Sequence, residues 1–465
     1  MNHKTAWTFV ISSTAVFMVT LDNLVVTTAL PVIRRHLHAG LGSLEWTVNA
    51  YTLTFAVLLL TGAALGDRFG RRRVFSLGLA VFTLGSAAAA LAPSIGALDA
   101  ARAVQGLGGA IVMPLTLTIL SSAVPAEKRG LALGAWGGIS GLAVACGPLV
   151  GGAVVSGLSW QWIFWLNVPI GLVLLPLALL RLDESHGPLA RLDLPGLGLA
   201  SAGLFGIVWG LVRANTLGWG STEIVAAFVA GAVLLALFVA WERRAAMPML
   251  PMSFFRSRTF ALANVSSLFM SFGMFGSVFL LAQFFQTVQH YTPFGSGLRI
   301  LPWTAMPMVV APIAGALSDR IGGHRLIGAG LALQAAGLAW IATVQTTTVA
   351  YADLIVPFAL SGIGMGLFFA PVANVVLSAV RPDQEGQASG ANNAIRELGG
   401  VLGVAVLASV FAHEGGYRTG QSFVDGMVPA VYIGAAIVAA GSLAAFAIGR
   451  RRSSAAAEPA LELSA

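Results

Sequence analysis

The chain has 465 residues, of which 57% are hydrophobic and only 10% are charged. Soluble domains carry a charge on roughly 25% of their residues, so this composition excludes a soluble protein and indicates a polytopic membrane protein. The net charge of +7 does not indicate nucleic-acid binding, because the arginines stand in short segments between apolar runs and form no basic patch on a soluble face.

Apolar runs long enough to span a bilayer, roughly 20 residues each, follow one another along the chain. They lie near 7–31, 46–66, 74–92, 98–121, 131–155, 161–180, 195–213, 223–241, 260–285, 296–317, 326–345, 352–378, 389–412 and 429–449. The sequence therefore predicts an all-α protein with fourteen transmembrane helices. We expect a six-helix bundle in 1–185, two inserted helices in 186–250, a second six-helix bundle in 251–452 and a disordered tail in 453–465.

The first run contains an acidic residue, Asp22, roughly halfway across the predicted helix. An ionised carboxylate at that depth is costly unless it is paired, faces water or binds a proton. We therefore expect Asp22 to serve a function.

The second run ends in a charged segment that recurs later in the chain. Leu65–Arg73 is echoed in Leu317–Arg325, which places Asp319 252 positions after Asp67. A second echo relates Pro114 to Pro371 at nearly the same distance, and this agreement indicates a duplicated chain. The glycine in each segment permits a tight reversal while the charges keep the turn in water.

The segment from Ala63 to Arg73 resembles the loop between helices two and three of the major facilitator superfamily, Gly-x-Leu-x-Asp-Arg-x-Gly-Arg-Arg. Ala63 stands where that family has its first glycine. The resemblance implies the superfamily fold and a cytoplasmic gate formed by Asp67, Arg68, Gly70, Arg71, Arg72, Asp319 and Arg320. The positive end of the helix dipole near Gln387–Gly390 is available as a partner for Asp67.

The fourth run contains a guanidinium, Arg102, followed by Gln105 and Gly106. Such a charge costs at least ~2.5–3.5 kcal/mol at mid-bilayer, so it needs an acidic partner or a wet cavity, unless it snorkels to the nearer surface. The pattern Arg-x-x-Gln-Gly resembles the fourth-helix motif of the superfamily. We therefore group Arg102 and Gln105 with Asp22 as the predicted proton and substrate site.

The fifth run is rich in glycine, which lets helices approach closely in lipid. Packing alone would explain these residues. Yet Gly147-Pro148-Leu149-Val150-Gly151-Gly152, with Gly141 before it, looks like the antiporter motif that separates exporters of the superfamily from uptake carriers.

The segment Leu21–Pro31 resembles the first helix of the fourteen-helix drug:proton antiporters. Trp162–Gly171 resembles the start of their sixth helix, although Gln161 stands where an arginine is usual. The resemblance covers nearly the whole chain and implies a polar cavity, for which the candidates are Asn23, Asn392, Asn393, Arg396 and Glu397. Because Arg396 and Glu397 are adjacent, we expect them on different faces of the helix.

Most Lys and Arg residues fall on the same side as the N-terminus when the predicted helices are threaded through a membrane. This bias predicts a multi-pass protein of the cell inner membrane with both termini in the cytoplasm.

We conclude from the sequence that the chain is a proton-coupled antiporter that exports small amphipathic compounds by alternating access. No Gly-x-x-x-x-Gly-Lys-Ser/Thr loop occurs, so we expect no cofactor and a proton gradient as the energy source. We expect no catalytic or metal-binding residues and no enzyme activity, because the histidines fall in loops or at helix ends.

The expected partners are a small substrate, protons and lipid, and a monomer suffices. A proton-coupled uptake carrier and a non-transporting sensor or scaffold remain alternatives.

Overall fold

The computed structural model describes residues 3–124, 126–186, 193–381 and 384–448, with some side chains of α2, α5, α11 and α14 left undescribed. The predicted tail, 453–465, lies outside these residues. Every regular element in the described ranges is helical. The elements are α1 (His3–Leu37), α2 (Leu41–Phe69), α3 (Arg71–Ala90), α4 (Ile95–Ala123), α5 (Ala126–Gly157), α6 (Trp162–Trp165), α7 (Asn167–Arg181), α8 (Leu194–Leu217), α9 (Thr222–Glu242), η1 (Met252–Arg256), α10 (Arg258–Thr287), α11 (Pro293–Ile321), α12 (Gly323–Val344), α13 (Tyr351–Leu377), α14 (Glu385–Glu414) and α15 (Gly420–Phe446).

Among the described residues, twelve helices are long and apolar enough to cross a membrane, with α6 and α7 forming one span. Helix α2 bends by 50° between Leu59 and Thr61 and brings the number to thirteen. Several positions of α5 are not described beyond the backbone, and the apolar segment found within its described part is Cys146–Gly157. The multi-pass architecture is therefore confirmed, whereas the number fourteen stays a prediction.

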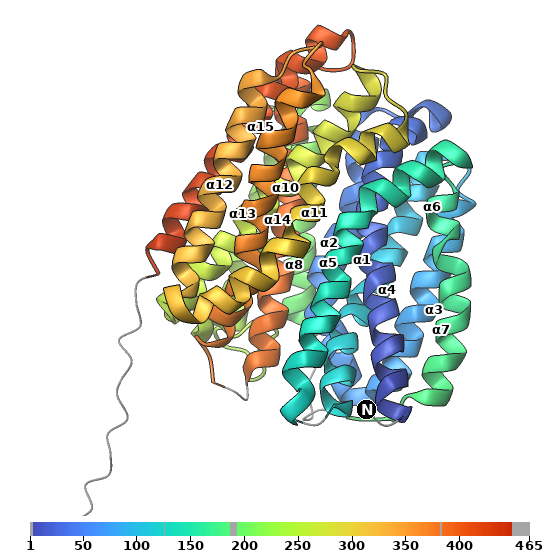
Figure 1. The fold of residues 1–465 in the computed structure, drawn as a ribbon, viewed down its shortest axis with the longest axis vertical. Helices are drawn as coiled ribbons and strands as arrows, with labels where there is room; N and C mark the ends of the chain where they lie inside the picture. The colour runs from blue at the N-terminus through green and yellow to red at the C-terminus, as the bar shows by residue number, and fades with distance from the viewer. Residues whose placement is uncertain (1–2, 125, 187–192, 382–383, 449–465) are drawn as a thin grey trace, which may run out of the picture.

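Contacts between distant segments define one end of the molecule. Lys4 Nζ lies 3.2 Å from Asp183 Oδ1, and Thr5 donates to the carbonyl of Ala123 at 3.2 Å. The N-terminus and the ends of α4 and α7 therefore share one face, which we call the N-terminal face (Figure 1, lower end). The opposite end is called the far face.

Two helical bundles lie side by side, one built from α1–α7 and the other from α10–α15 (Figure 1). Equivalent helices pack in the same way in each: α2 and α3 pack on α4, as α11 and α12 pack on α13. Helix α1 packs on α5, as α10 packs on α14. The sequence repeat thus corresponds to a repeated packing arrangement, although the boundaries at 185 and 250 stay predictions.

Helices α8 and α9 form a hairpin that contacts α2 of the first bundle and α14 of the second. Near the far face, Asn215 Nδ2 donates to the carbonyl of Ser409 on α14 at 2.6 Å. Near the N-terminal face, Thr61 Oγ1 of α2 lies 3.7 Å from Sδ of Met249, just after the hairpin. The inserted hairpin is therefore attached to both bundles.

Candidate functional site

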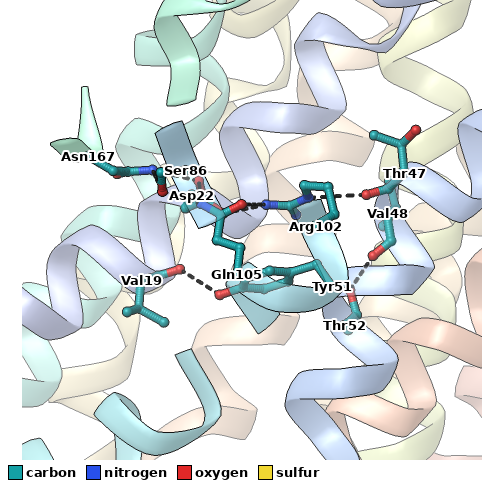
Figure 2. A network of polar contacts seen from close by, with 10 residues as sticks. All are labelled: Val19, Asp22, Thr47, Val48, Tyr51, Thr52, Ser86, Arg102, Gln105 and Asn167. Carbon is teal, nitrogen blue, oxygen red and sulfur yellow. Dashed lines mark hydrogen bonds and ion pairs between the residues drawn. The ribbon is translucent and has the colours of Figure 1, made fainter. Parts of the chain in front are cut away.

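Asp22 lies in the middle of α1 with only 2% of its surface exposed. Its Oδ2 atom accepts from Arg102 Nη1 at 2.6 Å, and its Oδ1 atom accepts from Gln105 Nε2 at 2.8 Å and from Asn167 Nδ2 at 2.7 Å. Figure 2 shows these side chains, from α1, α4 and α7, converging on the carboxylate. One guanidinium and two amides thus compensate a charge that burial would otherwise make very costly.

Arg102 is fully buried, so the alternative that it snorkels to a surface is wrong. Its Nε atom donates to the carbonyl of Thr47 at 3.2 Å, and its guanidinium carbon lies 4.2 Å from the centre of the Tyr51 ring. A cation over an aromatic face gains further stabilisation when it is desolvated. The Nη2 atom has no hydrogen-bond partner in the described part of the chain, which leaves one donor of this cation free.

Two members of this cluster were missed in the sequence analysis. Gln105 Nε2 donates to Ser86 Oγ at 2.7 Å, and Asn167 supplies the third hydrogen bond to the carboxylate of Asp22. Asn167 could have been identified from the sequence, because a polar amide inside an apolar run needs a hydrogen-bond partner. Ser86 had none, since serine among alanines is common in closely packed membrane helices. The structure brings Asp22, Arg102 and Gln105 together as expected, and their role stays a prediction.

The charged turn after α2 is held by a segment that the sequence analysis did not single out. Gly70 has φ +103°, a conformation that L side chains rarely adopt, and the turn could not form with most other residues. The Glu184 carboxylate accepts from the backbone N–H of Arg72 at 2.9 Å and lies 3.7 Å from the side chains of Arg72 and Arg73. Arg71 N donates to the carbonyl of Ser185 at 2.8 Å.

Asp67 pairs with Arg71, one turn along the chain, at 2.8 Å. The described contacts place no α14 group on Asp67, and α14 begins at Glu385 rather than near Gln387–Gly390. The expected dipole partner is therefore not observed in this conformation. Arg68 and Arg320 are exposed, and the side chain of Asp319 lies outside the described residues.

The glycines of α5 face two different neighbours. A Cβ atom on Gly147 would lie 2.6 Å from Leu24 Cβ, and one on Gly151 would collide with Thr28 and with the carbonyl of Val25. Leu24, Val25 and Thr28 follow Asp22 on α1. This face of α5 therefore packs closely against α1, the helix that carries Asp22.

The other face of α5 meets α11 of the second bundle. A Cβ on Gly152 would collide with the carbonyl of Pro293, and one on Gly297 would collide with the carbonyl of Pro148. The two helices thus touch backbone to backbone at the seam between the bundles. Gly141 lies among the positions of α5 that the structure does not describe beyond the helical backbone.

Polar residues of α14 line a small cavity at the seam with α13. Asn393 and Arg396 face Phe369 across a cavity of about 80 Å³. Asn392 also borders it and donates to Asn264 Oδ1 at 3.1 Å and to Ser267 Oγ at 2.8 Å. This cavity lies between two helices of the second bundle, and the role of its polar residues in binding a compound stays a prediction.

Arg396 and Glu397 were expected on different faces of α14, and this placement stays a prediction. Their side chains meet, with Arg396 Nη2 3.3 Å from Glu397 Oε1. Glu397 is buried, and its Oε2 atom lacks a described hydrogen-bond partner. Asn23 Oδ1 on α1 is likewise buried without a partner in the described ranges, so each bundle keeps an unused polar atom.

The far face is closed by contacts between the bundles. Gln286 Nε2 of α10 donates to the carbonyl of Thr28 on α1 at 2.8 Å, and the Arg34 guanidinium carbon lies 3.5 Å from the centre of the Tyr417 ring. Burial raises the pKa of the Tyr417 hydroxyl well above its usual value, against the opposing effect of Arg34, so the hydroxyl stays neutral and donates to Gln283. A cavity of about 480 Å³, bordered by Arg34 and Gln283, lies at this face.

A sequence model described as Major Facilitator Superfamily matches residues 12–404. The chain belongs to the major facilitator superfamily. It is therefore a multi-pass membrane transport protein and not an enzyme.

Relatives within the superfamily are similar over most of the chain. The multidrug resistance protein Stp of Mycobacterium tuberculosis (strain CDC 1551 / Oshkosh) is 37% identical over 89% of this chain and 77% of its own length. The tetracenomycin C resistance and export protein of Streptomyces glaucescens is 34% identical over 88% and 76%. The cephamycin export protein CmcT of Amycolatopsis lactamdurans is 37% identical over 86% and 84%.

Solved structures of other transporters share the fold. An auto-inhibited peptide transporter of the POT family superposes with a TM-score of 0.71 at 17% identity, over 98% of this chain and 99% of that one. A bacterial homologue of the human lysosomal transporter Spinster gives a TM-score of 0.68 at 14% identity, over 96% and 97%. At these identities the likeness concerns the fold alone.

Proposed function

We propose that the chain exports small amphipathic compounds from the cytoplasm in exchange for protons. The observation that carries this proposal is the buried Asp22 carboxylate, held by Arg102, Gln105 and Asn167 in the apolar middle of the first bundle. A carboxylate in that position is a functional site by default in a membrane protein. The export direction is supported by the printed functions of relatives, which resist or export antibiotics.

Proton exchange at Asp22 would change the contacts of Arg102. When Asp22 takes up a proton, the charged contact becomes a weaker neutral one, and Arg102 is left to find other acceptors. Tyr51 belongs to α2, which packs against α14, and the centre of its ring lies 4.2 Å from the Arg102 guanidinium carbon. A change of charge at Asp22 is therefore felt at the seam where the compound would bind.

Alternating access requires that the far-face contacts separate while the N-terminal face closes. The closed far face and the Asp67–Arg71 pair within one bundle fit a conformation that opens toward the N-terminal face. We place this face, with both termini, in the cytoplasm and the protein in the cell inner membrane. No cofactor is needed, and each chain holds its own acid and cavity, so a monomer suffices.

The test uses everted membrane vesicles and a compound chosen from a susceptibility panel in a pump-deficient host. Wild-type protein should concentrate the compound in the vesicles at the expense of the proton gradient, and adding compound should release protons. Asp22→Asn should abolish both, because an amide cannot exchange a proton. Asp425→Asn, which alters an exposed acid on α15, should change neither.

Two results would overturn the proposal. Undiminished uphill transport by the Asp22→Asn variant would remove Asp22 from the mechanism and direct attention to Glu397. Accumulation of a nutrient by intact cells that express the protein would show an uptake carrier instead.

A further inference from the structure

Two carboxyl groups meet at the base of the inserted hairpin, away from the Asp22 cluster. Asp193 stands directly before α8, where its Oδ1 atom caps the helix by accepting from Gly196 N at 2.9 Å. The same atom accepts from Trp241 Nε1 at 2.7 Å. Glu242 ends α9, and its Oε2 atom accepts from the backbone N–H of Leu250 at 3.0 Å. One oxygen of each carboxyl group thus accepts hydrogen bonds from the protein.

The second oxygen of each group is buried without a described donor. Asp193 Oδ2 and Glu242 Oε1 both lack a hydrogen-bond donor, and Glu242 is only 2% exposed. Both atoms lie against Gly196: a Cβ there would be 2.7 Å from Glu242 Oε1 and would collide with Asp193 Oδ2. The two oxygens are therefore close neighbours, since both lie next to the same point beside Gly196.

Ionised carboxylates only accept hydrogen bonds, so two of them cannot bond to each other. A proton on either one turns the pair into a donor and an acceptor and removes one of two buried like charges. No described basic side chain forms an ion pair with either group. Arg243 and Arg244 follow Glu242 and are exposed, and the remaining groups acting on Glu242 are the backbone N–H groups of Met249 and Leu250.

We propose that Asp193 and Glu242 form a proton-binding site that fastens the base of the hairpin by sharing one proton. Gly196 is part of the site, because any side chain there would occupy the space between the two oxygens. The site goes beyond the proposed exchange at Asp22 and does not depend on it.

The proton holds the connector after α9 in place. Leu250 is anchored to Glu242, and Met249 beside it contacts Thr61 of α2. Loss of the shared proton leaves two negative charges facing each other in a buried position, and the hairpin relieves this repulsion by releasing the connector. Because the two carboxylates face each other only while the hairpin is closed, the shared proton stabilises the closed hairpin, and this local stability is present at low pH and lost as pH rises.

Hydrogen exchange of the connector, residues 243–252, tests the site in the purified full-length protein. The protection factor, corrected for the intrinsic pH dependence of exchange, should fall by about tenfold or more between about pH 6 and about pH 9 in the wild type. Glu242→Gln should keep its protection throughout, because its amide donates to Asp193 at every pH. Glu223→Gln, at the exposed start of the same helix, should behave as the wild type.

A second variant guards against misfolding of the first. Asp193→Asn retains an acceptor for the α8 cap, since Asn and Asp cap helices about equally well, and it should show the same flat profile. An equal loss of protection in the wild type and in either variant would overturn the proposal. So would recovery of wild-type protection at high pH on addition of sodium, potassium or magnesium chloride, which would show a metal cation in place of the proton. Transport is not measured, so failure here leaves the exchange at Asp22 untouched.

Discussion

Arg102 contacts Asp22 through Nη1 at 2.6 Å, while its Nη2 atom has no hydrogen-bond partner among the described residues. The two charges therefore compensate each other, but one hydrogen-bond donor group of the guanidinium has no described acceptor. Removing the cation alone should leave a buried, uncompensated carboxylate, a change that costs about 3–5 kcal/mol. We therefore expect the Arg102→Gln variant, purified in detergent, to unfold at a clearly lower temperature than the wild type.

The double variant Asp22→Asn/Arg102→Gln provides the control for this prediction. It removes both charges, so it should recover most of the lost thermal stability while remaining inactive in transport. A double variant that is no more stable than Arg102→Gln would contradict an ion pair as the cause.

Asp67→Asn should leave the protein folded and inserted but slow its turnover. The substitution removes the charge that pairs with Arg71 at 2.8 Å, and we expect this charge to find a different partner when the N-terminal face closes. Initial rates of export at matched expression measure the effect. Asp183→Asn, which removes an exposed ion pair with Lys4 on the same face, should transport normally, since such pairs contribute little. Wild-type rates for Asp67→Asn would rule out a gating role.

Gly147→Leu should impair export, because even a Cβ at this position would lie 2.6 Å from Leu24 Cβ. Overpacking of this kind costs about 1–3 kcal/mol and would push α1, with Asp22, away from α5. Gly138→Leu on the same helix is the matched control, since a Cβ there meets nothing within 4 Å. Equal activity of the two leucine variants would mean that the close approach of α5 to α1 has no part in transport.

Gly70→Ala should destabilise the protein more than Gly322→Ala does. Both glycines have positive φ, +103° and +97°, so both substitutions carry a backbone strain of about 1–3 kcal/mol. At Gly70 the new Cβ would also lie 2.8 Å from the Glu184 carboxyl carbon, whereas at Gly322 it would approach only the His324 ring, at 3.2 Å. Thermal unfolding of the two variants compares the repeats directly. A larger effect at Gly322 would contradict this ranking.

The sequence was sufficient for the bundle architecture and for the meeting of Asp22 with Arg102. An isolated charge in an apolar helix is costly unless an opposite charge or hydrogen bonds compensate it. The presence of one acid and one arginine in such helices therefore predicts that the two form a pair. Ser86 could not be foreseen in the same way, because a hydroxyl in a helix can bond to its own backbone and needs no distant group.

Other features depended on side-chain length and conformation. Adjacent residues of a helix point in different directions, yet the side chain of Arg396 contacts Glu397. The arginine side chain is long and flexible enough to extend beyond the helix face that carries its Cα. Asp67 pairs with Arg71 one turn along the chain, and a single conformation cannot reveal the different partner that the proposed gating role requires. Glu184 stands in a polar linker where a carboxylate carries no distinguishing pattern.

The contact of α5 with α11 has a consequence for the membrane around the protein. At Gly152 and Gly297 the helices meet through backbone carbonyls that already accept hydrogen bonds within their own helices, so parting them leaves no polar group unsatisfied. Adhesion there comes from dispersion and from the exclusion of lipid chains, without a hydrophobic driving force. In the proposed exchange, opening of the far face would expose two glycine-lined surfaces to acyl chains, and lipid composition would then help to set the conformational equilibrium.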